Sequence, residues 1–181
     1  HDVKVICVEG QLTDHYNPMD KTVNLSQEVY HGRNAAATAV AAHECGHAVQ
    51  HATAYSFLQL RSAMVPIQNV SGQILNFVMM GMMFGAFFAQ SMLPWKMALL
   101  IIIACYGVFA LFALITLPVE FDASKRALAW IDDRGIVTRQ EHDMAKDALK
   151  WAAMTYVVAA IGAVTTLVYY IMMYLGANRD E

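Results

Sequence analysis

The chain has 181 residues, of which 57% are hydrophobic and 15% charged. Soluble domains average about 45–50% and about 25%, so the composition argues against an ordinary soluble globule and excludes a disordered chain. The formal net charge of −3 provides no basic surface for nucleic acid. Three widely spaced cysteines form neither a disulfide framework nor a CxxC metal knuckle. Because the chain opens at His1 with no signal-like segment, we expect a processed or partial form of a longer protein.

Short strands are expected first, at 3–8 and 21–26, around the turn-rich sequence TDHYNPMD. An Ala-rich helix follows at about 34–53. Near Pro118 another helix is expected, with the proline close to its first turn, and it should end near Gly135. A further helix from about Thr138 should run straight into the last apolar segment of the chain.

Three stretches lack Asp, Glu, Lys, Arg and His: residues 62–95, 97–119 and 151–178. A helix needs about 20 apolar residues to cross a bilayer, so we predict transmembrane spans at roughly 73–93, 97–117 and 152–175. Three buried helices of a large soluble core are the alternative, but such helices normally keep a polar stripe. The fold class is therefore a mainly α integral membrane protein with about three spans and a small zincin-like α+β catalytic portion.

A tight hairpin is expected at Pro94-Trp95-Lys96, which puts 1–72 and 118–151 on the same side of the membrane as the catalytic portion. Residues 73–117 then form a transmembrane hairpin, 152–175 a third span and 176–181 a tail. Most basic residues fall on the catalytic side, namely Lys4, Lys21, Arg33, Arg61, Lys125, Arg126, Arg134, Arg139, Lys146 and Lys150. Only Lys96 and Arg179 fall on the other side, so the positive-inside rule predicts a cytoplasmic site in a plasma (inner) membrane protein.

The predicted helix at 34–53 contains the pattern HExxH, as His43-Glu44-Cys45-Gly46-His47. Histidines four residues apart project from one helical face, so both rings can reach one Zn²⁺ ion. The Glu lies one step round the helix, where it can contact a metal-bound water without being a ligand. Two histidines that only contact polar neighbours near a membrane surface are the alternative.

Catalytic zinc needs a third protein ligand. His51 is about 12 Å along the helix axis from His43, so it suits a polar surface position or a contact with one of the zinc-ligating side chains. Glu120 is the better candidate, since it follows the second span on the first turn of the expected helix. Asp122 is its competitor, but it points about 200° away from Glu120 and also suits a charge interaction with the helix N-terminus.

The segments GQLTDHYNP, AAHECGHAVQHA, LRSAMVP and TLPVEFDASKRAL together resemble the YugP-type neutral zinc metallopeptidases. HExxH followed by Glu-x-x-Ala after a membrane hairpin is more distantly similar to the HtpX-type and CAAX-prenyl membrane proteases. The resemblance spans essentially the whole chain and implies zinc ligation by His43, His47 and Glu120, with Glu44 as general base. The distant relatives carry an Asp four residues after the Glu ligand, whereas this chain has Ser124, which can bond a neighbour but holds an imidazole less firmly. YugP-type members also usually carry an upstream membrane helix.

The chemistry implied is peptide hydrolysis by a zinc-activated water, with Glu44 moving the proton. Candidates for a donor to the oxyanion are left open among His15, His142, Tyr156 and Arg126. His15 is expected in a turn, and His142 on a solvated surface. A free edge on the strand at 21–26 would bind a peptide by strand addition.

Two other residues of the HExxH helix are expected to act in packing. Cys45 lies about 200° round the helix from His43, so it should pack rather than bind metal. Gly46 costs about 1 kcal/mol in mid-helix relative to Ala, which suggests that another backbone passes close to it.

The leading functional hypothesis is a membrane zinc endopeptidase acting on membrane-associated proteins, with the lipid bilayer and a protein or peptide substrate as partners. A second membrane protein or a second copy of the chain is open as a further partner. An intramembrane site-two-type protease is disfavoured, because the motif is flanked by polar residues and its Asp-Gly element is missing. The non-enzymatic alternative is a catalytically silent zinc-binding membrane scaffold or regulator, but a structural site needs a fourth protein ligand.

Overall fold

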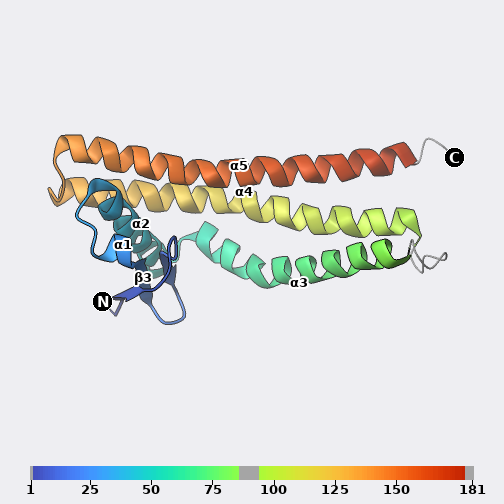
Figure 1. Ribbon diagram of the computed structural model, residues 1–181, viewed down its shortest axis with the longest axis horizontal. Coiled ribbons are helices and arrows are strands. Elements are labelled where there is room, and N and C mark those ends of the chain that lie inside the picture. Colours follow the sequence, from blue (N-terminus) through green and yellow to red (C-terminus); the bar gives the residue numbers. More distant parts are fainter. Residues whose placement is uncertain (1, 86–93, 178–181) are drawn as a thin grey trace. The chain divides into compact units, whose positions relative to one another are not determined.

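The computed structural model of the chain describes residues 2–85 and 94–177. It divides into two compact units, one of His1–Gln59 with Thr116–Tyr156 and one of Leu60–Ile115 with Val157–Glu181. Helices α3, α4 and α5 run from one unit into the other (Figure 1).

A three-stranded sheet opens the first unit, with β1 (Lys4–Val8), β2 (His15–Asn17) and β3 (Thr22–Ser26) in the order β1-β3-β2. β1 pairs with β3 in parallel and β2 pairs with β3 antiparallel. The two predicted strands are confirmed, each within one residue of its predicted ends. The free edge predicted for 21–26 is wrong, because β3 is the central strand. His15 was expected in a turn but lies in β2, a three-residue strand too short to give a sequence signal.

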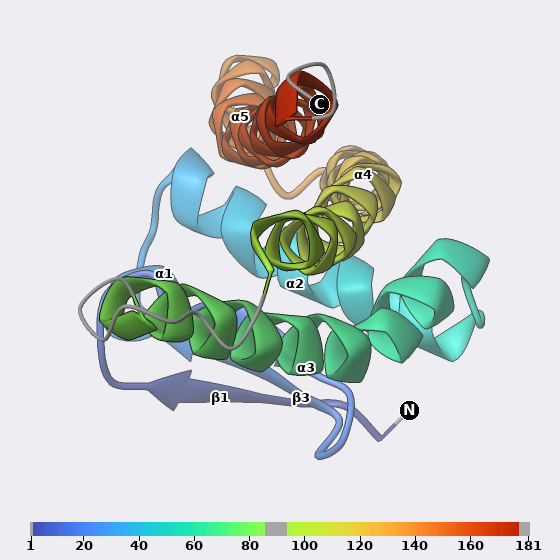
Figure 2. The ribbon, with the colours of Figure 1, turned by 90° about the vertical axis from the view of Figure 1, so that its right-hand side faces the viewer.

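Helix α1 (Gln27–Tyr30) leads from the sheet to α2 (Ala35–Ala52), which confirms the predicted HExxH helix. Asn34 caps α2, since its Oδ1 accepts a hydrogen bond from the backbone N–H of Ala37 at 2.9 Å. α2 lies over the strands (Figure 2). Val23 and Leu25 of β3 and Ala48 of α2 form the core between them.

The end of α4 (Trp95–Asp133) and the start of α5 (Arg139–Ala177) complete the first unit. They pack on α2 through a core made mostly of small side chains: Ala39, Ala42, Ala127, Ile131, Ala145 and Leu149. α4 ends just before Gly135, which has a positive φ of 59°. α5 begins after Thr138, whose hydroxyl and backbone N–H both donate to Glu141 at 2.8 Å in a capping box. Both boundaries agree with the sequence prediction.

Pro118 does not begin a helix, because α4 continues through it from Trp95. The proline removes one intrahelical hydrogen bond, whereas a break in the helix would leave several N–H and C=O groups without partners at two new ends. Trp95 and Lys96 also lie in the first turn of α4, so the predicted tight hairpin at Pro94-Trp95-Lys96 is wrong for these two residues. Residues 86–93, which come directly before Pro94, lie outside the described residues.

The second unit is helical, with most of α3 (Ser56–Gly85), the first part of α4 and the last part of α5. Val78, Ala98 and Ile102 form its buried core. Tyr106 and Tyr170 stack on one another, with ring centroids 5.2 Å apart.

Within the described residues, α4 and α5 are each long and apolar enough to cross a membrane, judged by length and composition. They contain the predicted spans 97–117 and 152–175. The predicted span 73–93 is helical over 73–85, in a helix that already begins at Ser56. The rest of that span, 86–93, lies outside the described residues.

Candidate metal centre

The two histidines of the HExxH motif lie on the part of α2 that faces α4. The rings of His43 and His47 meet edge to face, with centroids 4.7 Å apart. Both side chains are largely buried, with exposed fractions of 14% and 11%. One turn of helix therefore holds two imidazoles against each other in a site with little solvent.

Glu120 completes the cluster from α4. Its Oε2 lies 3.2 Å from Nε2 of His43 and 3.6 Å from Nε2 of His47, and its side chain is 2% exposed. One ligand atom from each of the three residues lies within 4.8 Å of the others. Ligand atoms of tetrahedral Zn²⁺ with bonds of about 2.0–2.1 Å are about 3.3 Å apart. The three side chains are thus spaced so that they could hold a zinc ion.

Gln50 fixes the orientation and tautomer of His47. The Gln50 Nε2 donates to the carbonyl of Val119 and to Oδ2 of Asp122, each at 2.8 Å. Its Oε1 must then be the acceptor that lies 3.0 Å from Nδ1 of His47. His47 therefore carries its proton on Nδ1, and the lone pair of Nε2 is directed at the cluster. Gln50 was not among the predicted site residues, although its place three residues after the second histidine puts it on the same helical face.

Ser124 makes the corresponding contact with the other imidazole. Its Oγ lies 3.1 Å from Nδ1 of His43, while Nε2 of His43 faces Glu120. A hydroxyl can either donate or accept, so this contact orients the ring of His43 without fixing its tautomer.

Asp122 is turned away from the cluster and binds the residues that support it. Its Oδ2 accepts from Gln50 and, at 2.6 Å, from Nε of Arg126. Burial alone would raise the pKa of Asp122, but the hydrogen bonds from Arg126 and Gln50 and the charge of Arg126 lower it below its usual value. The expected interaction with a helix N-terminus is wrong, because Asp122 lies in the interior of α4.

Gly46 allows α2 and α4 to come close enough for the cluster to form. A Cβ atom at Gly46 would lie 2.7 Å from the backbone oxygen of Ala123. The prediction that another backbone passes close to this glycine is confirmed. Ala123 lies next to Ser124 and three residues from Glu120, so this contact sets the separation of the residues on the two helices.

Glu44 is buried beside the three candidate ligands, with an exposed fraction of 8%. The backbone N–H of Tyr16 in β2 donates to its carboxylate. Burial raises the pKa of Glu44, and the opposing effects of the two histidines and of this hydrogen bond are smaller. The pKa shift brings this carboxyl closer to neutral pH, as suits a general base.

The other histidines considered as site residues, His15, His51 and His142, are not part of this cluster. The ring of His15 donates from Nδ1 to the carbonyl of Thr13 at 2.7 Å, and that of His51 bonds through Nδ1 to the Tyr16 hydroxyl at 2.9 Å. His142 lies in the first turn of α5. Of the other residues proposed to bind the oxyanion, Arg126 bonds to Asp122, and Tyr156 lies farther along α5 with 37% of its surface exposed.

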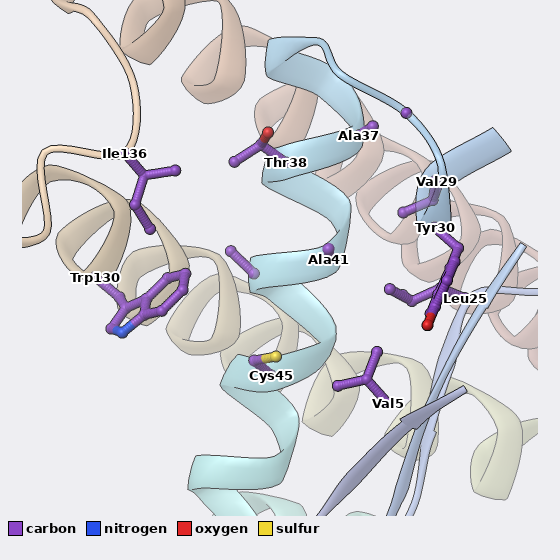
Figure 3. A pocket seen from close by; sticks show the side chains of 12 residues that line it. Val5, Leu25, Val29, Tyr30, Ala37, Thr38, Ala41, Cys45, Trp130 and Ile136 are labelled. Atoms are coloured by element: carbon purple, nitrogen blue, oxygen red, sulfur yellow. The ribbon is translucent and has the colours of Figure 1, made fainter. Parts of the chain in front are cut away.

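Cys45 faces a separate cavity of about 340 Å³. Figure 3 shows the Cys45 side chain on α2, with Trp130 and Ile136 to one side and Val5 and Leu25 to the other. Burial raises the pKa of the Cys45 thiol, which keeps it protonated and unreactive. This placement agrees with the expectation that Cys45 acts in packing.

The fold and the site together define a helical chain with a buried His-His-Glu cluster and a carboxylate beside it. The chain belongs to the family described as "Putative neutral zinc metallopeptidase", whose sequence profile matches residues 1–175. It is similar to a Bacillus subtilis (strain 168) protein named "Putative membrane protease YugP", with 40% identity over 184 residues. That alignment covers 100% of this chain and 76% of the relative. No solved structure matches the chain.

Proposed function

We propose that the chain is a membrane-bound zinc endopeptidase that hydrolyses peptide bonds of membrane-associated proteins. His43, His47 and Glu120 would be the ligands of the zinc ion, and Glu44 the general base. The observation that carries this proposal is the convergence of three ligand atoms from α2 and α4 within 4.8 Å. Family membership supports the reaction class, and the name of the Bacillus relative supports the membrane setting.

The charges of the site support a divalent cation as its occupant. Glu44 and Glu120 are both nearly fully buried, and the charge of Glu120 adds to the rise in the pKa of Glu44. Two buried carboxylates side by side are costly unless a positive charge compensates them. Two neutral imidazoles and one carboxylate are a ligand set that suits zinc.

Zinc, when bound, lowers the pKa of a coordinated water and polarises the scissile carbonyl. Glu44 takes a proton from the attacking water and delivers it to the leaving amine. The N–H of Tyr16 holds the carboxylate in position for both transfers. Gln50 and Ser124 keep the two imidazoles turned toward the cluster, and the burial of the site limits the competing water.

The proposed setting is the plasma membrane, with α4 and α5 crossing the bilayer and the site on the cytoplasmic side. The apolar run of α4 ends at Val119, beside Glu120, and the basic residues concentrate on the same side as the site. Cys7 gives a direct test because it is exposed in β1. A membrane-impermeant maleimide should label Cys7 in inverted vesicles and not in intact cells. Labelling in intact cells would reverse the proposed orientation.

The ligand assignment is tested by elemental mass spectrometry on the detergent-purified full chain. We expect about one zinc per chain in the wild type and a strong loss in Glu120→Ala. Glu28→Ala, at an exposed position in α1, is the matched control and should keep the metal. Full retention of zinc by Glu120→Ala would overturn the role of Glu120, and no zinc in the wild type would overturn the peptidase proposal.

The role of Glu44 separates an enzyme from a silent scaffold. Glu44→Gln should retain zinc and lose peptide hydrolysis by a factor of about 10³ or more, because both proton transfers lose their carrier. Unchanged function in that variant would favour the zinc-binding scaffold or regulator. A membrane protein containing an unfolded cytoplasmic segment is a suitable first substrate.

A further inference from the structure

A second, basic pocket lies between α4 and α5 within the first unit. It has a volume of about 270 Å³, and Lys125, Lys146 and Lys150 lie on its rim. None of the described residues that line it is acidic. Lys125 comes from α4, and the two other lysines come from α5, one helical turn apart. The pocket therefore presents three positive charges around one opening.

Within the part of the chain that the structure describes, none of the three lysines forms an ion pair. Asp122, which lies near Lys125, is already bound by Arg126 and Gln50. Three like charges around one opening repel each other unless an anion lies between them.

The walls of the pocket are mostly apolar and lie next to the apolar run of each helix, after that run on α4 and before it on α5. Leu128 and Leu149 line the pocket, and Phe121, 49% exposed, forms the wall nearest to the apolar run of α4. On α5 the apolar run begins at Trp151, directly after Lys150. On α4 the apolar run ends at Val119, six residues before Lys125, so on both helices the lysines lie within about two turns of the residues proposed to enter the bilayer.

Trp151 lies on α5 at the point where its apolar run begins. Its side chain is 64% exposed, and the ammonium group of Lys150 lies 5.9 Å from the centroid of its ring. Tryptophan and lysine together are typical of the headgroup region of a membrane.

We propose that this pocket binds an anionic phospholipid, with the headgroup phosphate between the three lysines and an acyl chain along Phe121. Basic pockets between membrane helices on the cytoplasmic side are suited to such headgroups. A free phosphate ion would satisfy the lysines but would leave the apolar wall uncovered, so the lipid accounts for both features. The inference rests on the proposed membrane placement of α4 and α5 and is independent of peptide hydrolysis.

The test is native mass spectrometry of the full zinc-loaded chain, released from detergent after titration with phosphatidylglycerol or with phosphatidylcholine of the same acyl chains. We expect one tightly bound phosphatidylglycerol and at least tenfold weaker binding of phosphatidylcholine. Each lysine near an anionic headgroup contributes a factor of about five in affinity. The double variant Lys146→Gln with Lys150→Gln should therefore bind phosphatidylglycerol about 25-fold more weakly.

The matched control is Lys4→Gln with Lys21→Gln, which removes two exposed lysines near the sheet. It should bind phosphatidylglycerol as the wild type does. Equal binding by both double variants, or equal affinity for the two lipids, would overturn the proposal. Displacement of the bound lipid by millimolar inorganic phosphate would overturn the lipid as the occupant in favour of a free anion.

Two further readouts separate failure of this inference from failure of the proposed function. Zinc content reports on the metal centre, and both double variants should keep the wild-type value. Resistance of the chain to alkaline extraction from membranes reports on the proposed spans. A chain that keeps zinc and stays in the membrane, but shows no preference for phosphatidylglycerol, contradicts the lipid pocket alone.

Discussion

The Nδ1 atom of His47 lies 3.0 Å from Oε1 of Gln50, a residue that is completely buried. Because both hydrogens of the Gln50 amide are used by Val119 and Asp122, this oxygen can only accept. The relationship connects Arg126, through Asp122 and Gln50, to a candidate zinc ligand. Support of this kind around a ligating histidine typically changes metal affinity by 10–100-fold.

Gln50→Leu should therefore weaken zinc binding by roughly 10–100-fold, since His47 loses the acceptor that fixes its tautomer. Competition with a chromophoric chelator measures these affinities. Gln140→Leu, at an exposed position in α5, is the control. Equal zinc affinity in wild type and Gln50→Leu would mean that other contacts position His47.

Gly46→Ala should disrupt the metal centre even though alanine favours helix. The new Cβ would lie 2.7 Å from the backbone oxygen of Ala123, so α4 must move away from α2 and carry Glu120 with it. We expect zinc content well below one per chain and a lower unfolding temperature. In Gly162→Ala the added Cβ meets nothing within 4 Å, so this control should keep zinc. A Gly46→Ala protein with full zinc content would show that the helices can shift without separating the ligands.

Residues whose role follows from helical spacing were the ones that could be predicted. His43, Glu44 and His47 share a helical turn, and a glycine within that turn indicates a close backbone, so one segment predicted both the cluster and the helix contact. Glu120 was expected beside them because it follows the second predicted span, and the resemblance to a family implied the same ligand. The geometry then places its carboxylate next to both imidazoles.

The errors arose where tertiary structure decides the outcome. Pro118 usually marks a helix start, but here the helix continues through it. β2 has only three residues, and its pairing with β3 removes the edge that the sequence suggested for 21–26. The spacing of Gln50 from His47 gives only its helical face, whereas its role depends on Val119 and Asp122, which are far away along the chain.

Asp122→Asn should lower stability in a pH-dependent way. The pKa of Asp122 is lowered by Arg126 and Gln50 against the effect of burial. The contribution of the Asp122 carboxylate to the free energy of unfolding is therefore present above the usual pKa of an aspartate. It is lost as the pH falls through the lowered pKa. The unfolding temperature of the variant should be lower by a few degrees at neutral pH, from the loss of about 1–2 kcal/mol. This difference should shrink in acid.

Thermal unfolding in detergent between pH 3 and pH 8 measures this difference. Asp132→Asn, at an exposed position on the same helix, serves as the control and should change little. A difference between wild type and Asp122→Asn that stays constant down to pH 3 would mean that the charge of Asp122 contributes nothing to stability.

Glu44→Gln should stabilise the metal-free chain at neutral pH. Burial raises the pKa of Glu44, so the ionised carboxylate destabilises the folded state relative to the unfolded one. This cost is fully present above the raised pKa, decreases as the pH falls through it, and is absent below the usual pKa of a glutamate. The variant should thus have the higher unfolding temperature at pH 7–8 and match the wild type near pH 3.

Zinc should reduce the advantage of Glu44→Gln, because a cation beside the carboxylate compensates the buried charge. Unfolding temperatures of both proteins, with a chelator and with excess zinc, test this effect of zinc across the same pH range. Glu28→Gln, at an exposed position in α1, should have no effect under either condition. If metal-free Glu44→Gln is the less stable protein at pH 7–8, the hydrogen bond from Tyr16 outweighs the burial of the charge. In that case the hydrogen bond between Glu44 and Tyr16 stabilises the packing of β2 on α2.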